Sequence, residues 1–161
     1  GEIGGITQWV DVVGRDGVLR RYAGSELQFG YRHSALREMG GAIVRASLQL
    51  RQGDPKAVHS ALCDRMMTRY AKQPVSMASA GSIFKRPEGD YAGRLLEEAG
   101  AKGMKVGGAQ VSTKHANFVV NLGGATARDV LELIAAARQL VYENSGVLLE
   151  PEVCVVGEDP E

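Results

Sequence analysis

The strongest constraint on the fold is a pair of strand-like runs near the start of the chain, at 9–13 and 18–22. The turn between them ends in Asp16-Gly17, and Asp-Gly between two such runs is a strong signal for a β-hairpin. We therefore expect an antiparallel or mixed sheet in the first part of the chain. Apolar residues alternate over 42–50, which predicts a further, half-buried strand.

Helix signals separate the expected strands. Asp54 before Pro55 is typical of a helix start, and we expect that helix to run to about Tyr70. Thr126 and Asp129 resemble a capping box, which predicts a helix that ends at Gly146. We also expect a short helix over 91–99 and strands over 104–106, 117–121, 147–149 and 153–156. Together these elements predict an α+β fold.

Composition excludes several classes of protein. The chain has 161 residues, 44% of them hydrophobic, so it can form one sizeable domain or two small ones. Its formal net charge is zero, which argues against a general nucleic-acid role, and no apolar run approaches membrane-spanning length. Cys63 and Cys154 are far apart, so we expect reduced thiols and no metal site. Because the first residue is glycine, we expect a piece of a longer protein.

Two segments carry candidate chemistry. Residues 81–87 combine the hydroxyl of Ser82, which can pass a proton, with Lys85 and Arg86, which can hold an anion. Residues 149–153 offer the carboxylates of Glu150 and Glu152 just before an apolar run. Singly, such residues are most often a turn serine and solvated charges, and only their joint occurrence favours one site.

Two other enzyme classes fit less well. The glycine-rich run 103–108 lacks the terminal Gly-Lys-Ser/Thr of a phosphate-binding loop, so a nucleotide hydrolase is disfavoured. A Ser-His-Asp hydrolase is conceivable with Ser82 and His115, but Ser82 is not in a Gly-x-Ser-x-Gly elbow.

Read together, five motifs resemble the UDP-N-acetylenolpyruvoylglucosamine reductase (MurB) family, flavoenzymes of bacterial cell-wall synthesis. The motifs stand in the family's order and cover nearly the whole chain: Phe-Gly-Tyr-Arg-His-Ser at 29–34, Gly-Ser-Ile-Phe-Lys-Arg-Pro at 81–87, Gly-Gly-Ala-Gln-Val-Ser at 107–112, His-Ala-Asn-Phe at 115–118 and Leu-Glu-Pro-Glu-Val at 149–153. Their order and spacing make the resemblance specific.

The resemblance implies the carboxyl-terminal half of such an enzyme. Residues 1–73 would be the rest of a PCMH-like FAD-binding domain whose amino-terminal half is missing. Residues 74–147 would form the substrate-binding α+β domain, and 148–161 a return strand to the FAD domain. The short segment 51–54 has no tyrosine, so the chain resembles the branch that lacks a tyrosine-bearing loop.

The resemblance also implies a reaction. NADPH reduces FAD, and reduced FAD gives hydride to the methylene carbon of UDP-N-acetylglucosamine enolpyruvate. A proton then adds to the adjacent carbon to give UDP-N-acetylmuramate, a peptidoglycan precursor made in the bacterial cytoplasm. By position, Ser82 would be the proton donor, Arg32 would lie beside the substrate carboxylate, and Glu152 would help to polarise it.

Further residues are assigned by the same resemblance. The expected substrate-binding residues are Tyr31, Lys72, Lys85, Arg86, His115 and Asn117. The expected cofactor-binding residues are Gly1, Glu2 and Ile3. We expect the piece alone to be inactive, and the alternative is a UDP-sugar-binding fragment without turnover, because the amino-terminal flavin-binding half is missing.

Overall fold

A computed structural model describes residues 2–157 of the chain. The chain divides into two compact units, Gly1–Val58 and His59–Glu161. Each unit has its own cluster of buried hydrophobic side chains. Within the described residues, no helix has both the length and the apolar character needed to cross a membrane.

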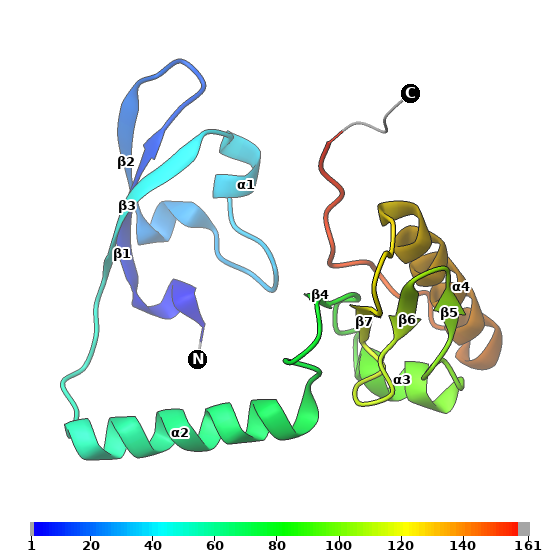
Figure 1. The fold of residues 1–161 in the computed structure, drawn as a ribbon. Helices are drawn as coiled ribbons and strands as arrows, with labels where there is room; N and C mark the ends of the chain where they lie inside the picture. The colour runs from blue at the N-terminus through cyan, green and yellow to red at the C-terminus, as the bar shows by residue number, and fades with distance from the viewer. Residues whose placement is uncertain (1, 158–161) are drawn as a thin grey trace. The chain divides into compact units, whose positions relative to one another are not determined.

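The first unit contains a three-stranded antiparallel sheet in the order β2-β1-β3 (Figure 1). Its strands are β1 (Thr7–Val13), β2 (Leu19–Ala23) and β3 (Ala42–Leu48). Short helices η1 (Ile3–Ile6), η2 (Gly24–Leu27) and α1 (Leu36–Met39) complete the unit. The hairpin predicted from Asp16-Gly17 is confirmed as β1 and β2, and Gly17 adopts a φ of +75° in its turn.

The core of this unit is small, and one face of its sheet carries charge. Val10, Val12 and Leu27 are buried together. Asp11 is only 4% exposed and receives a 2.7 Å hydrogen bond from Arg21, which lowers the pKa of the carboxyl group. The Arg21 guanidinium also lies 3.5 Å from the centre of the Trp9 ring, so charge and aromatic contacts together align β1 with β2.

The strand expected over 42–50 is confirmed as β3, but the expected half-burial of its residues is wrong. Every residue of β3 except Ser47 is exposed. β3 forms an edge of the sheet, pairing with β1. Alternation specifies which side chains share a face, but burial requires a second element to cover that face. No described element of the first unit covers it.

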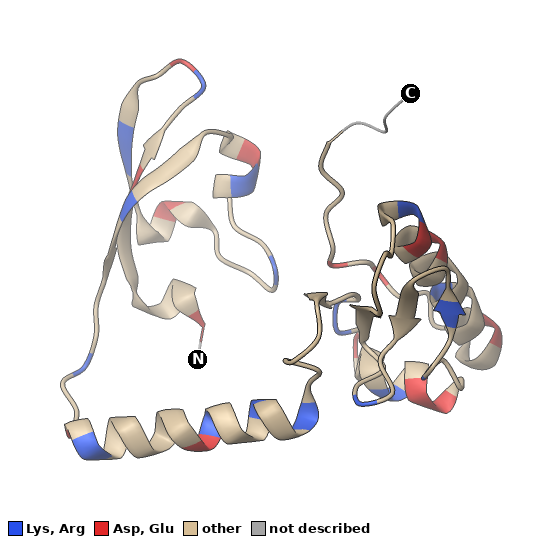
Figure 2. Ribbon diagram, in the orientation of Figure 1, with Lys and Arg blue, Asp and Glu red and all other residues tan. Residues whose placement is uncertain are grey.

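Helix α2 (Pro55–Lys72) begins where the sequence predicts. The Asp54 carboxylate accepts hydrogen bonds from the N–H groups of Lys56 and Ala57 at 3.2 and 3.3 Å, as an N-cap does. None of the helix's residues is buried, and Lys and Arg outnumber Asp and Glu along it (Figure 2).

The second unit contains a four-stranded antiparallel sheet in the order β4-β7-β6-β5. Its strands are β4 (Ser79–Ser82), β5 (Lys105–Val106), β6 (Ala109–Val111) and β7 (Phe118–Asn121). Two helices, α3 (Ala92–Glu98) and α4 (Ala127–Ser145), pack with this sheet (Figure 1). The mixture of helices with antiparallel strands confirms the predicted α+β class.

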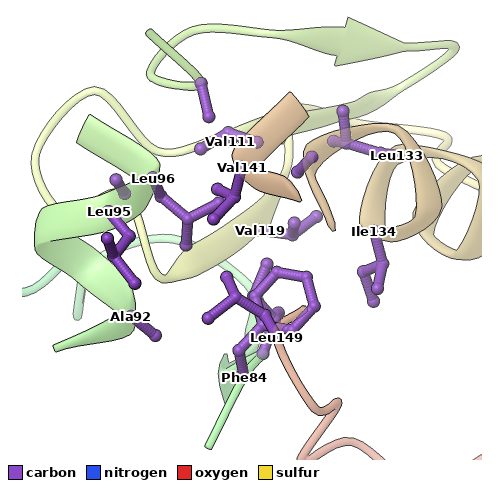
Figure 3. Close-up of a cluster of buried hydrophobic side chains, with 14 of the residues drawn as sticks. Phe84, Ala92, Leu95, Leu96, Val111, Val119, Leu133, Ile134, Val141 and Leu149 are labelled. Carbon is purple, nitrogen blue, oxygen red and sulfur yellow. The ribbon is translucent and has the colours of Figure 1, made fainter. Parts of the chain in front are cut away.

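Both helices and the sheet contribute to one core in this unit. Figure 3 shows Leu95 and Leu96 of α3 on one side of the cluster and Leu133 of α4 on the other. Phe84 and Leu149 lie next to each other in this core and are each 1% exposed. Two segments far apart in the sequence, one after β4 and one after α4, are therefore anchored in the same hydrophobic cluster.

Residues next to each end of α4 determine where the helix begins and ends. The Thr126 hydroxyl accepts a 3.1 Å hydrogen bond from the Asp129 N–H, and the Asp129 carboxylate accepts one of 3.0 Å from the Thr126 N–H. This confirms the predicted capping box. Gly146 ends the helix with a φ of +72°, a conformation that glycine adopts without strain.

The closing strands expected over 147–149 and 153–156 are absent from the described residues. Only an isolated bridge forms in this part, between Pro151 and Phe84. A strand requires a hydrogen-bonded neighbour along its length, and an apolar run alone does not supply one. The expected strands over 147–149 and 153–156 are therefore wrong, whereas the return of 148–161 to the FAD domain stays a prediction, and residues 158–161 lie outside the described part.

Candidate active site

In the first unit, Arg32 lies on a tight turn. Gly30 and His33 exchange two backbone hydrogen bonds, of 3.0 and 3.1 Å, and Tyr31 and Arg32 form the tip between them. Arg32 has a φ of +54°, in the left-handed region that favours glycine. Backbone strain of this kind at a residue with a large side chain often marks a functional position.

A hollow of about 350 Å³ adjoins this turn. Glu2 and Ile3, two of the predicted cofactor-binding residues, line it together with Tyr31 and Arg32. The third, Gly1, lies outside the described residues. The hollow is at the low end of the roughly 300–1,000 Å³ that ligand pockets occupy, so it suits one part of a large ligand. Its Arg32 and Arg37 side chains bring cationic hydrogen-bond donors to an otherwise mixed surface.

In the second unit, Ser82 is the last residue of β4. It pairs with Phe118 of β7 and is half-buried. Gly81 directly before it has a φ of +85°, which allows the chain to turn there. The hydroxyl is therefore carried by backbone that is tied to the central part of the sheet.

The predicted Glu-Pro-Glu segment lies beside the residues that follow Ser82. The Glu152 N–H donates to the Ile83 carbonyl at 2.8 Å, and the Lys85 N–H donates to the Glu150 carbonyl at 2.8 Å. The Lys85 ammonium also forms an ion pair with the Glu150 carboxylate. Ser82, Lys85 and Glu152 thus lie on two adjacent, hydrogen-bonded segments.

Helix α4 supports the Glu-Pro-Glu segment from one end. The Arg138 Nε donates a 2.7 Å hydrogen bond to the Leu149 carbonyl, and the Leu149 side chain is buried in the core. A cation on a long helix and an apolar anchor therefore fix the start of this segment before it reaches Glu150.

Arg86 and Lys72, two cations among the predicted substrate-binding residues, have different surroundings. The Arg86 Nε donates to the Asp90 carbonyl at 3.2 Å, and its guanidinium lies 4.2 Å from the centre of the Tyr91 ring. These contacts orient an exposed guanidinium near the start of α3. Lys72 is exposed at the last position of α2.

His115 and Asn117 lie on the loop that leads into β7. Burial, and to a smaller degree the charge of Lys102, lower the pKa of His115. Its Nδ1 accepts a 3.2 Å hydrogen bond from the Asn117 N–H, and its ring meets that of Phe118 edge to face. Asn117 itself is buried, at 7% exposed.

The structure thus groups the predicted residues by unit. Arg32, Tyr31, Glu2 and Ile3 share the hollow of the first unit. Ser82, Lys85 and Glu152 share the paired segments of the second. Within residues 2–157, no group of three or more His, Cys, Asp or Glu side chains could hold a metal ion.

Two contacts that support the Glu-Pro-Glu segment were not predicted from the sequence. Lys85 and Glu150 are 65 residues apart, and Arg138 acts on a carbonyl group rather than on a side chain. No local pattern reports either contact. The only sequence signal for them is the motif order, which suggests that 81–87 and 149–153 belong together.

Comparison with known proteins places these features in a family. Residues 73–156 match the family model "UDP-N-acetylenolpyruvoylglucosamine reductase, C-terminal domain". Proteins named UDP-N-acetylenolpyruvoylglucosamine reductase from Heliobacterium modesticaldum and Levilactobacillus brevis are 46% and 45% identical over 98% and 99% of this chain, and 51% and 53% of their own length is matched. A crystal structure of UDP-N-acetylenolpyruvylglucosamine reductase (MurB) from Thermus caldophilus is similar with a TM-score of 0.80 and 39% identity, over 94% of this chain and 53% of that one. The chain spans about half the length of the relatives it matches.

Proposed function

Because this chain belongs to the UDP-N-acetylenolpyruvoylglucosamine reductase family, we propose that it is the carboxyl-terminal half of an FAD- and NADPH-dependent reductase. Its substrate would be UDP-N-acetylglucosamine enolpyruvate and its product UDP-N-acetylmuramate, in peptidoglycan synthesis in the bacterial cytoplasm. The observation that carries this proposal is the pairing of 83–85 with 150–152, which puts a hydroxyl, an ammonium and a carboxyl group on neighbouring segments.

The proposal divides the chain as the family resemblance predicts. Residues 1–73 complete an FAD-binding domain, 74–147 bind the UDP-sugar, and 148–161 return to the FAD domain. The hollow lined by Glu2, Ile3 and Arg32 is suited to hold part of the flavin cofactor and the acid end of the substrate. FAD, when bound, would pass the hydride that it receives from NADPH to the methylene carbon of the enolpyruvyl group.

The chain's own residues would stabilise the negative charge that develops in that step and would donate the proton. Hydride addition develops negative charge on the substrate carboxylate as an enolate. The guanidinium of Arg32 can offer two parallel hydrogen bonds to this group, and Glu152 would help to polarise it. The Ser82 hydroxyl would then give its proton to the adjacent carbon, which is possible because the enolate is strongly basic.

The remaining side chains would bind the substrate and help to return a proton to Ser82. Lys85 lies three residues after Ser82 and could help to return a proton to the serine oxygen. Arg86 and Lys72 would bind the diphosphate, with Tyr31, His115 and Asn117 contacting other parts of the substrate. Arg86 suits this role because its contacts with Asp90 and Tyr91 hold the guanidinium in one orientation.

The experiment that tests the proposal separates the two half-reactions. In the full-length polypeptide that carries this chain, Ser82→Ala should slow flavin reoxidation by the enolpyruvyl substrate at least about 100-fold, the range of a lost general acid. Reduction of the flavin by NADPH should keep its rate, which stopped-flow absorbance measures. Full-rate reoxidation in Ser82→Ala would refute the role of the serine.

A second candidate applies to this chain by itself. Because the chain spans about half the length of its relatives while the second unit has a core of its own, it could bind the UDP-sugar without turnover. Calorimetric titration of the chain with the enolpyruvyl substrate, with and without FAD, distinguishes this binding module from the reductase half. Binding without retention of yellow flavin supports the binding module.

A further inference from the structure

The backbone from Ile83 to Lys85 is held by hydrogen bonds from both sides. On one side, the Ile83 carbonyl and the Lys85 N–H bond to the Glu-Pro-Glu segment. On the other side, the Ile83 N–H donates to the Asn117 carbonyl at 3.0 Å. The N–H and the carbonyl of Phe84, between them, are both bonded to one side chain, that of Asn117.

The Asn117 side chain thus takes the place of a neighbouring strand. Its Oδ1 accepts from the Phe84 N–H at 3.0 Å, and its Nδ2 donates to the Phe84 carbonyl at 2.9 Å. Of the short side chains, only asparagine offers a donor and an acceptor in this fixed arrangement, because aspartate lacks the donor and leucine lacks both. The amide is buried, so water cannot easily replace these bonds.

Asn117 is itself fixed by its neighbours. Its N–H donates to the His115 Nδ1 at 3.2 Å, and the next residue, Phe118, pairs with Ser82. The residues on either side of the clamped Ile83–Phe84 pair are Ser82 and Lys85, the two side chains assigned to the proton. A shift of the Phe84 peptide would therefore move both of them.

We propose that Asn117 is a positioning residue, which clamps the Phe84 peptide and thereby holds Ser82 and Lys85 in place for proton transfer. This rests on the proposed function, and it replaces the substrate contact assigned to Asn117 above, because both polar atoms of the Asn117 side chain are bonded to Phe84. A displacement of about 1 Å at such a site can lower turnover about 100-fold, so the clamp affects the rate of the substrate half-reaction.

The test is a double-mutant cycle in the full-length polypeptide. Asn117→Ala should slow flavin reoxidation by the enolpyruvyl substrate about 10- to 100-fold and leave flavin reduction by NADPH within twofold. In a Ser82→Ala background, the same change should slow reoxidation less than threefold, because the displaced hydroxyl is already absent. Asn121→Ala is the matched control, since Asn121 is the last residue of β7, the strand that Asn117 precedes, and its side chain bonds only to the Gly123 and Ala125 N–H groups among the contacts described.

A second measurement does not depend on activity. In this 161-residue chain, amide hydrogen exchange by NMR should show the Phe84 N–H protected, and Asn117→Ser should speed its exchange at least about tenfold more than that of the Val120 N–H. Asn117→Ser also replaces Asn117→Ala in the cycle if the alanine variant does not fold.

The outcomes separate this inference from the proposed function. If Ser82→Ala is slow while Asn117→Ala or Asn117→Ser reoxidises flavin at full rate, the positioning role is wrong and the proposed function stands. If the Asn117 and Ser82 effects multiply, the asparagine acts independently of the serine, and the inference is again wrong. If Ser82→Ala reoxidises flavin at full rate, the proton-donor assignment fails with it, and the exchange of the Phe84 amide alone decides whether the clamp exists.

Discussion

The anchor of the Glu-Pro-Glu segment can be tested by removing one buried side chain. Leu149 is 1% exposed in the core of the second unit, whereas its neighbour Leu148 is 59% exposed. A buried leucine truncated to alanine costs about 2–5 kcal/mol, from the lost transfer free energy and the remaining cavity. Since the residues that follow Leu149 form only an isolated bridge, the segment can shift to fill part of the cavity, and we expect about 3 kcal/mol for Leu149→Ala.

The assay is equilibrium unfolding of the chain in urea. With an m-value of about 2 kcal/mol/M, a loss of about 3 kcal/mol lowers the midpoint of the second unit by about 1.5 M. Methyl NMR signals of Leu133 and Val141 follow that unit, because both side chains are buried in its core. The single tryptophan, Trp9, lies in the first unit, so its fluorescence should show an unchanged transition.

The control variant makes this prediction refutable. Leu148→Ala removes the same atoms from an exposed position, and we expect a change within about 0.5 kcal/mol. Equal losses for Leu148→Ala and Leu149→Ala, or a loss below about 1 kcal/mol for the buried residue, would show that the segment is not anchored as described. Faster amide exchange at Lys85 and Glu152 should accompany Leu149→Ala, since their bonds follow the anchor.

Three further predictions concern caps, protonation and backbone. Thr126→Ala removes the helix cap and should destabilise the second unit by about 1 kcal/mol in the same urea assay. The pKa of His115 is lowered in the folded state, so the unfolded chain binds more protons than the folded chain does. The stabilising contribution of His115 is therefore present above its ordinary pKa of about 6.5 and is lost as pH falls through its folded-state pKa. Unfolding measured from pH 7 down to pH 5 should show this loss, and His115→Gln should remove it. Gly41→Ala should destabilise the first unit by more than about 1 kcal/mol, since φ is +95° and the added Cβ would lie 2.3 Å from the Val13 carbonyl oxygen. Gly5→Ala, which meets no atom within 4 Å, is its control, and tryptophan fluorescence reports both.

Elements with local signals were predicted correctly. The Asp16-Gly17 hairpin, the start of α2 after Asp54 and the capping box at Thr126 are confirmed, because each is specified by residues within a few positions of one another. The α+β class and the family were also predicted, the first from these elements and the second from the order of the motifs.

Features that depend on distant partners were not predicted. The exposure of β3 and the missing strands over 147–149 and 153–156 have one cause: an apolar pattern defines a face or an edge but not its neighbour. The hydrogen bonds between Asn117 and Phe84 were not predicted for a related reason. Asparagine near a strand usually signals a turn, and only the fold places it against a peptide 33 residues away.

Under the proposed function, the residues around Ser82 couple the stability of the second unit to its chemistry. Ile83 and Phe84 are each 1% exposed, whereas Ser82 and Lys85 on either side of them are half-buried. The same four-residue stretch thus carries two core anchors between two chemical groups, and its backbone is bonded on both sides. In the proposed reaction the Ser82 hydroxyl is a weak acid, so accurate positioning would have to compensate for its weak acidity. Substitutions in the core beneath this stretch should therefore lower turnover before they unfold the protein.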